Sequence, residues 1–437
     1  MCAYLHFLKP ASRLKKNPEL YTTALGAIAA FCTYTSMYGF RKGITAVQFE
    51  GIAFGGIDYK IWLITAQVLG YAVSKGIGVK VVSEMKPHQR PWYVLGLIGF
   101  AEFALLGFGL VPAPYNIVFL FLNGLPLGMV YGTVLAMLEG RKQTEILVAA
   151  LTASFIFASG LVKTVALLLM QQGGVSEVWA PFVTGVIFVV PLLLSVWGLS
   201  RLPAPSEEDK ILRTERLPMN RLDRKKFMGT FPTGLTLLII SYVLLSAFRD
   251  FRDNFAPEIL KGTMDGNPTI FAQTETLIAL IILGLMAGLR WVDDHFRAFT
   301  LINILMIAGA VLVGLSTWLY QLGSVSASAW FMLTGLGMYM AYVPCNGLYF
   351  ERLVATFRYV STVGFIVTLA DWYGYLGSVA VLLYKNFGQA NLSFQEFFVY
   401  GCYGLSGLYI LLTVFSYGSF RRKYKKGLAE LSTASLV

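Results

Sequence analysis

The 437-residue sequence predicts an all-α polytopic membrane protein whose twelve transmembrane helices form two six-helix bundles. Hydrophobic residues make up 56% of the chain and charged residues only 14%, whereas soluble domains carry about 25% charged residues. The mean hydropathy is +0.63, and apolar runs of about 20 residues, enough to cross a bilayer, recur along the chain. These observations exclude a disordered chain, a collagen, a disulfide scaffold and an ordinary soluble enzyme.

The twelve expected spans are apolar runs separated by short polar segments. They lie near 21–47, 57–82, 92–111, 115–138, 146–170, 179–200, 232–255, 273–291, 298–319, 328–349, 359–383 and 396–418. The longest polar stretch, 201–230, separates six spans from six, as in transporters built from a duplicated half. We therefore expect an N-terminal bundle over 1–200, a cytoplasmic linker over 201–230, and a C-terminal bundle with a cytoplasmic tail over 231–437.

The basic residues predict the orientation in the membrane. Most of the 35 Lys and Arg residues fall in segments that lie on one side of the membrane, and such segments are normally cytoplasmic. The sequence thus predicts a multi-pass protein of the plasma (inner) membrane with both termini in the cytoplasm. This arrangement accounts for most of the net charge of +11, so no nucleic-acid partner is needed.

The sequence contains no motif for a metal site, a cofactor site or a catalytic centre. The four cysteines, Cys2, Cys32, Cys345 and Cys402, form no CxxC or Cys/His cluster, so we expect neither a metal nor a cofactor. The expected spans contain no pairing of a nucleophile with a base, and the chain is not expected to be an enzyme. The partners that remain are the lipid bilayer and a small molecule, bound by a monomer.

Charged residues at the ends of spans one and seven are the first site candidates. Arg41 and Lys42 end the first apolar run and either reach the outer headgroups or, because the following residues stay apolar, face an internal cavity. Four charged residues close span seven: Arg249, Asp250, Arg252 and Asp253. Arg249 and Asp253 are i,i+4 neighbours on a helix, and the four residues form either a self-neutralising cluster at the rim or an anion-binding arginine steadied by carboxylates.

Three short motifs carry a family resemblance. Tyr38-Gly-Phe-Arg41-Lys42 resembles the span-one motif of the organophosphate:phosphate antiporters of the major facilitator superfamily. Tyr71-Ala-Val-Ser74-Lys75 is similar to the span-two Tyr-x-x-Ser-Lys of that family, and Arg249-x4-Asn254-Phe-Ala-Pro257 to its span-seven Arg-x4-Asp-Trp-Ser-Pro. These matches cover the ends of three helices, whereas the twelve-span layout covers the whole chain.

The resemblance implies a fold of the major facilitator type and a cationic pair, Arg41 and Arg249, with Lys42 and Lys75 in support. An arginine offers a planar fork of donors for phosphate oxygens and keeps its charge when desolvated. With one arginine in each half, a bound anion would lower the repulsion between the halves and draw them together. This is a simple drive for rocker-switch alternating access.

Other intramembrane charges depart from that family. Ser154 stands about where the family has a histidine, and span five carries Lys163 instead. Glu102 and Asp371 are carboxylates within spans three and eleven, as proton coupling needs. The alternatives for Lys163 and Asp371 are structural contacts with Tyr or Ser on a neighbouring helix. Asp250 and Asp253 beside the arginine pair would weaken phosphate binding.

The resulting prediction is a secondary active transporter of a small organic anion, such as an organophosphate exchanged for phosphate. Two alternatives stay open: a proton-coupled symporter or exporter that uses Asp371 or Glu102, and a non-transporting membrane sensor on the same scaffold. Gly284 and Gly288 stand in a Gly-x-x-x-Gly spacing that predicts close helix packing. Further candidates for contact with the substrate are tyrosines on spans one, two, four and ten: Tyr38, Tyr71, Tyr131, Tyr342 and Tyr349.

Overall fold

The computed structural model describes residues 18–138, 141, 143–203, 221–261, 267–357, 364–389 and 391–434. Six long helices make the first bundle: α2 (Pro18–Lys42), α3 (Tyr59–Glu84), α4 (Arg90–Leu110), α5 (Ile117–Leu138), α6 (Thr144–Gln171) and α7 (Ala180–Ser200). Six make the second: α10 (Pro232–Asn254), α12 (Ile270–Arg290), α13 (His295–Gln321), α14 (Ala327–Pro344), α16 (Gly364–Phe387) and α17 (Phe394–Ala434).

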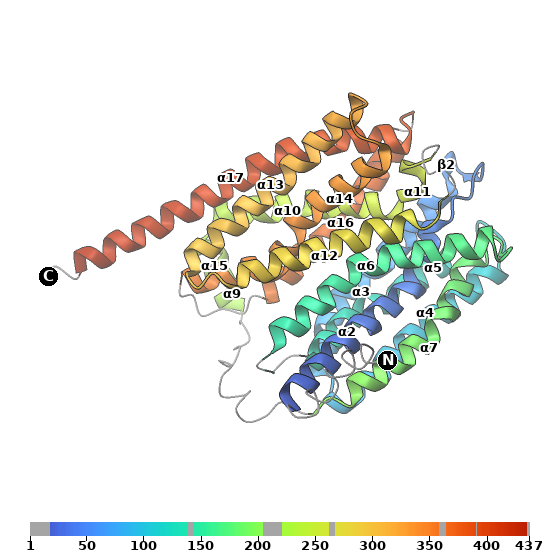
Figure 1. Ribbon diagram of the computed structural model, residues 1–437, viewed down its shortest axis with the longest axis horizontal. Coiled ribbons are helices and arrows are strands. Elements are labelled where there is room, and N and C mark those ends of the chain that lie inside the picture. The colour runs from blue at the N-terminus through green and yellow to red at the C-terminus, as the bar shows by residue number, and fades with distance from the viewer. Residues whose placement is uncertain are drawn as a thin grey trace, which may run out of the picture.

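Short elements connect these helices. They are η1 (Gly43–Ala46), η2 (Pro87–Gln89), α9 (Arg221–Thr230), α11 (Ala256–Ile259), η3 (Cys345–Tyr349) and α15 (Phe350–Thr356). An antiparallel hairpin joins β1 (Ala53–Phe54) to β2 (Ile57–Asp58). Figure 1 shows β2 and α11 at one end of the molecule, and α9 with the C-terminal end of α17 at the other. We call the first of these the hairpin end.

The predicted fold class is confirmed. Within the described residues, eight helices are long and apolar enough to cross a membrane by length and composition. The long helices outside that set are α2, α3, α14 and α16, and they supply much of the polar cavity lining described below. Polar groups are costly inside a bilayer unless they face a partner or water, so these helices are suited to an interior position.

Some boundaries differ from those expected. The first span ends at Lys42, and the chain continues as the 3-10 turn η1. Span ten ends at Pro344, after which a π-helical turn and α15 continue to Thr356. Span twelve extends well beyond residue 418, to Ala434. Of the expected linker, residues 204–220 lie outside the described residues and 221–230 form α9.

Glycines allow close contact of helices, but not at the predicted pair. A Cβ on Gly124 of α5 would lie 2.1 Å from the carbonyl oxygen of Gln67 in α3, so these two helices touch through their backbones. A Cβ on Gly160 of α6 would lie 2.3 Å from the carbonyl oxygen of Phe271 in α12, across the bundle interface. The prediction for Gly284 and Gly288 is wrong, because a Cβ at either would meet no atom within 4 Å.

Candidate functional site

A cavity lies between the two bundles, and charged and aromatic side chains line it. Its volume is about 50 Å³, room for only a few water molecules. The first bundle contributes Tyr34, Tyr38, Arg41, Lys42, Tyr71, Lys75, Tyr131 and Phe155. The second contributes Arg249, Asp250, Asp253, Tyr339, Tyr342, Asp371 and Tyr375.

The structure thus brings together the two arginines, the two lysines and four of the five tyrosines named above for substrate contact, and Asp371 with them; Tyr349 does not line the cavity. Glu102 and Lys163, the other two coupling candidates, do not line the cavity. Lys163 lies directly behind it, on Asp253, whereas Glu102 lies between α4 and α7. Their roles in binding or coupling stay predictions.

Arg41 is buried, with 8% of its surface exposed, so its side chain does not reach outward from the helix end. Its guanidinium carbon lies 3.9 Å from the ring centroid of Tyr71, a cation–π distance. Among the described residues no carboxylate lies within ion-pair distance of it. Its Nε is buried and donates no hydrogen bond.

The backbone around Arg41 is held by polar side chains of neighbouring helices. The last carbonyl groups of a helix have no partner within the helix. Here the Gln67 side-chain amide donates to the carbonyl oxygen of Arg41 at 3.0 Å, and the Asn123 amide donates to that of Phe40 at 2.9 Å. Gln67 also donates to Asn123 at 2.8 Å. These contacts fix the end of α2 and therefore the direction in which Arg41 leaves it.

Arg249 occupies the equivalent place on α10 but has a carboxylate partner. Its guanidinium carbon lies 3.8 Å from the ring centroid of Tyr342, while its Nη2 donates to Asp250 at 2.6 Å. Ser378 of α16 donates to the other oxygen of Asp250 at 2.8 Å. The pairing makes Arg249 and Asp250 together neutral.

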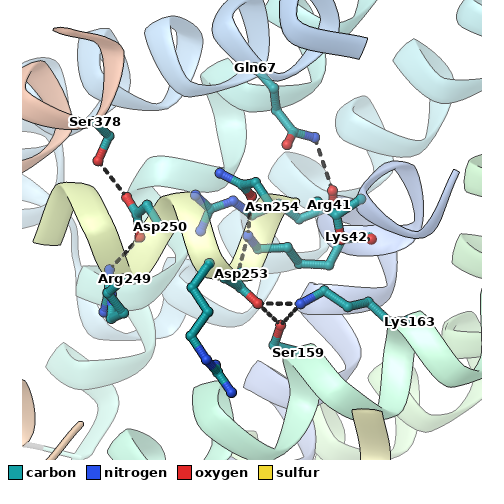
Figure 2. A network of polar contacts seen from close by, with 12 residues as sticks. Arg41, Lys42, Gln67, Ser159, Lys163, Arg249, Asp250, Asp253, Asn254 and Ser378 are labelled. Carbon is teal, nitrogen blue, oxygen red and sulfur yellow. Dashed lines mark hydrogen bonds and ion pairs between the residues drawn. The ribbon is translucent and has the colours of Figure 1, made fainter. Parts of the chain in front are cut away.

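Asp253 forms ion pairs with two lysines of the opposite bundle. Its oxygens accept from Lys42 at 2.6 Å and from Lys163 and Ser159, as Figure 2 shows. Lys42 also donates to Asn254 at 2.7 Å. The expected support of the arginine pair by Lys42 is therefore not observed: its ammonium group joins α2 to α10.

The second expected supporting lysine is also paired across the interface. Lys75 of α3 lies 3.3 Å from Asp371 of α16, and the Tyr242 hydroxyl donates to the same carboxylate. The alternative that Asp371 makes a polar contact with a tyrosine on a neighbouring helix is thus what the structure has, with an ion pair in addition.

The self-neutralising cluster that was one alternative for the end of α10 is present only in part: Arg249 pairs with Asp250, but the other two charges point away from that pair. Arg252 donates to Glu275 of α12 at 2.8 Å and to the carbonyl oxygen of Phe331. Asp253 faces the first bundle instead of Arg249. Helical spacing gives the neighbours along α10, but the partners are set by the helices packed around it.

The carboxylate oxygens of Glu102 are buried, although the residue as a whole is only partly so. In the described part of the chain, neither carboxylate oxygen accepts a hydrogen bond. They pack against Gly185 of α7, where a Cβ would lie 2.1 Å from Oε2. An ionised carboxylate in such a place is unfavourable, so a neutral side chain should serve there equally well.

Further ion pairs join the bundles at the hairpin end. Lys60, at the start of α3, is fully buried; it pairs with Glu258 of α11 and donates to the carbonyl oxygen of Thr45 at 3.0 Å. Lys261 and Glu50 form an exposed pair at 3.1 Å. Lys60 and Glu258 could not be singled out from the sequence, because each stands at the edge of an apolar run, where charges at the membrane interface are normal.

Comparison with solved structures supports the reading of the fold. The chain is similar to the nucleoside transporter NupG (TM-score 0.61, 12% identity, 91% of this chain and 100% of that one). It is likewise similar to a D-xylose-proton symporter (0.60, 13%, 91% and 97%) and to a proton-dependent oligopeptide transporter (0.62, 13%, 93% and 100%). These neighbours have the major facilitator fold, and so does this protein.

The family is shown by the sequence itself. Residues 43–423 match the model of a family of unknown function (DUF5690), and because the match covers most of the chain, the protein belongs to this family. No curated protein matches it. The resemblance to the organophosphate:phosphate antiporters stays a prediction, since it concerns only the helix-end motifs.

Proposed function

We propose that this protein is a secondary transporter that carries a small organic anion by rocker-switch alternating access. The observation that supports it best is the charge of the cavity between the bundles, where four cationic side chains face three carboxylates. Arg41 and Arg249 come from equivalent helices of the two halves, and in the proposal the anion binds between them. The partners are the bilayer and the anion, and the transporter acts as a monomer.

The ion pairs at the hairpin end support one stage of such a cycle. Lys42, Lys60 and Lys163 of the first bundle bind carboxylates of the second, which closes that end. If the protein lies in the plasma membrane with both termini in the cytoplasm, the hairpin end faces the outside. The structure is then a conformation that is closed to the outside. A cavity of about 50 Å³ must widen before it admits a solute, because each bound water alone needs about 10–15 Å³.

The proposal is tested by uptake into proteoliposomes of purified protein. Radiolabelled anions are offered with and without unlabelled anion inside. Trans-stimulation by internal anion indicates exchange, and uptake driven by an imposed gradient indicates symport. If no organic anion is taken up by wild-type protein above empty vesicles, while a cation or neutral solute is, the proposal is wrong.

Proton coupling is the second candidate, and the position of Asp371 favours it. Asp371 lies in the cavity and makes an ion pair with Lys75 of the opposite bundle, so its protonation would break a contact between the two halves. We expect Asp371→Asn to stop gradient-driven accumulation while sparing exchange. Accumulation at the wild-type rate in the Asn variant would contradict this role.

A further inference from the structure

We infer that the cargo is a monoanion, a small monocarboxylate, whose charged group binds Arg41; a phosphate dianion does not fit this cavity. The inference rests on the proposed transport function and names the substrate class for the same site. It departs from the phosphate substrate that the helix-end motifs suggest. It follows from how the charges of the cavity are paired.

Each of the three carboxylates that line the cavity already holds a cation. Asp250 pairs with Arg249, Asp253 with Lys42, and Asp371 with Lys75. Those pairs account for three of the four lining cations. In the part of the chain that the structure describes, Arg41 is the one lining cation without a carboxylate partner. The lining therefore presents a single positive charge in excess.

The second lysine on Asp253 does not change what the cavity offers to a ligand. Lys163 adds a positive charge behind the wall, but its ammonium group donates to Asp253 and to Ser159. Lys42 likewise donates to Asp253 and Asn254. Both lysines use their donors within the protein, whereas the guanidinium of Arg41 makes no hydrogen bond in the described residues.

The geometry at Arg41 suits one carboxylate. A guanidinium binds a carboxylate through two parallel hydrogen bonds. The guanidinium carbon of Arg41 lies 3.9 Å from the ring centroid of Tyr71, and its Nε donates no hydrogen bond within the described residues. A second negative charge on the ligand would find no free cation, because the other three lining cations each hold a carboxylate already. A charge buried without a partner is unfavourable.

The tyrosines that line the cavity indicate the chemistry of the part of the ligand that is not the carboxylate. The rings of four further tyrosines, Tyr34, Tyr38, Tyr131 and Tyr375, also line the cavity. Such rings stack on flat apolar faces, and their hydroxyl groups form hydrogen bonds. An aromatic or sugar ring that carries one carboxylate matches both features.

The test uses two matched sets of probes on the purified full-length protein. The first set is glucuronate, glucose 6-phosphate and glucose; the second is benzoate, phenyl phosphate and benzyl alcohol. Dissociation constants are measured at pH 7.5 by ligand-dependent thermal stability. We expect the carboxylate of at least one set to bind at least about tenfold more tightly than its phosphate, a difference of about 1.4 kcal/mol.

A change of pH separates charge number from shape. The second pKa of a phosphomonoester is about 6, so at pH 5 glucose 6-phosphate and phenyl phosphate become mainly monoanions, while the carboxylates keep their charge. Relative to the carboxylate of its own set, each phosphate should gain affinity between pH 7.5 and pH 5. The carboxylate serves as the control for titration of the protein itself.

Substitutions test whether Arg41 is the residue that binds the carboxylate. Arg41→Gln should weaken carboxylate binding at least about tenfold, in line with the loss of a charge-assisted hydrogen bond. The double variant Arg249→Gln/Asp250→Asn removes an ion pair with no net charge, so it should lose less affinity for the carboxylate than Arg41→Gln does. The exposed Lys261→Ala, which lies outside the cavity, controls for the general loss of a positive charge.

The inference is overturned if in neither set the carboxylate binds more tightly than its phosphate at pH 7.5, or if neither carboxylate binds better than its neutral analogue. It is also overturned if Arg41→Gln leaves carboxylate binding intact. A phosphate that binds and is transported would refute the monocarboxylate alone and leave anion transport standing. Binding of neutral solutes only would refute both.

Discussion

Arg41 and Arg249 sit at equivalent places in the two bundles, and the difference between them is informative. Both guanidinium groups stack on a tyrosine, Tyr71 at 3.9 Å and Tyr342 at 3.8 Å. Arg249 has Asp250 at 2.6 Å, whereas Arg41 has no carboxylate nearby among the described residues. The two halves thus share a design for holding an arginine at the interface, and only one of them leaves its charge unneutralised.

The ion pairs at the hairpin end differ from the cavity in how completely their charges are paired. There the described lysines that cross the bundle interface each have a carboxylate partner, and the buried ones have a second polar contact as well. Buried charges are tolerated when paired and hydrogen-bonded. Full pairing serves closure of the interface, and the unpaired Arg41 in the cavity is available for a ligand.

The largest expected effect follows from breaking the buried contact at Asp253. Asp253→Asn leaves Lys42 and Lys163 without a counter-charge, and removing one partner of a buried ion pair costs about 3–5 kcal/mol. We expect the bundles to part at the hairpin end. Spin labels at the exposed Ile52 and Asn267 should report a longer and broader distance distribution.

The exposed pair at the same end provides the control. Lys261→Ala breaks a contact between side chains that are 64% and 61% exposed, and exposed ion pairs contribute about 0–1 kcal/mol. The label distances should be nearly unchanged. Equal effects of the Asp253 and Lys261 variants would show that burial of the pair is not what closes this end.

The next effect concerns the arginines themselves. In transport assays Arg41→Gln should lower anion uptake by more than Arg249→Gln, because only the former removes the unneutralised charge of the cavity. A charge-assisted hydrogen bond contributes about 1.5–3 kcal/mol, so a loss of roughly tenfold or more is expected at Arg41. A greater loss at Arg249 would reverse the assignment of roles.

The smallest effect is expected away from the interface, at Glu102. Glu102→Gln keeps the shape of a side chain whose oxygens are buried without a partner, and the amide removes the need to bury a charge. Uptake and its dependence on a pH gradient should match those of the wild type. Loss of gradient-driven accumulation in this variant would restore Glu102 as a coupling group.

The sequence was sufficient to predict the fold because the signals for it are local. Apolar runs and the distribution of basic residues predict the spans and their division at 201–230, and neither depends on tertiary contacts. The end of span ten could not be predicted, because the residues from Cys345 to Tyr349 remain apolar where α14 gives way to a π-helical turn.

Charged residues within apolar runs predicted which residues belong to the site, but they did not predict which of these residues form ion pairs with each other. Spacing along one helix suggests Arg249 with Asp253, yet Asp253 binds Lys42 and Lys163 from the other bundle. The glycines show the same limit: Gly284 and Gly288 have a packing spacing, yet a Cβ at either would meet no described atom within 4 Å, whereas Gly124 contacts the backbone of α3. Partners are decided by which helices meet, and one sequence alone does not specify that.

The most direct test of the account is uptake of a radiolabelled monocarboxylate, benzoate or glucuronate, into proteoliposomes that contain wild-type protein or the Arg41→Gln variant. Spin-label distances are measured in parallel to show that the variant keeps the closed hairpin end. The account predicts saturable uptake by the wild type and a loss of roughly tenfold or more in a correctly assembled variant. Equal uptake by the two proteins would contradict it.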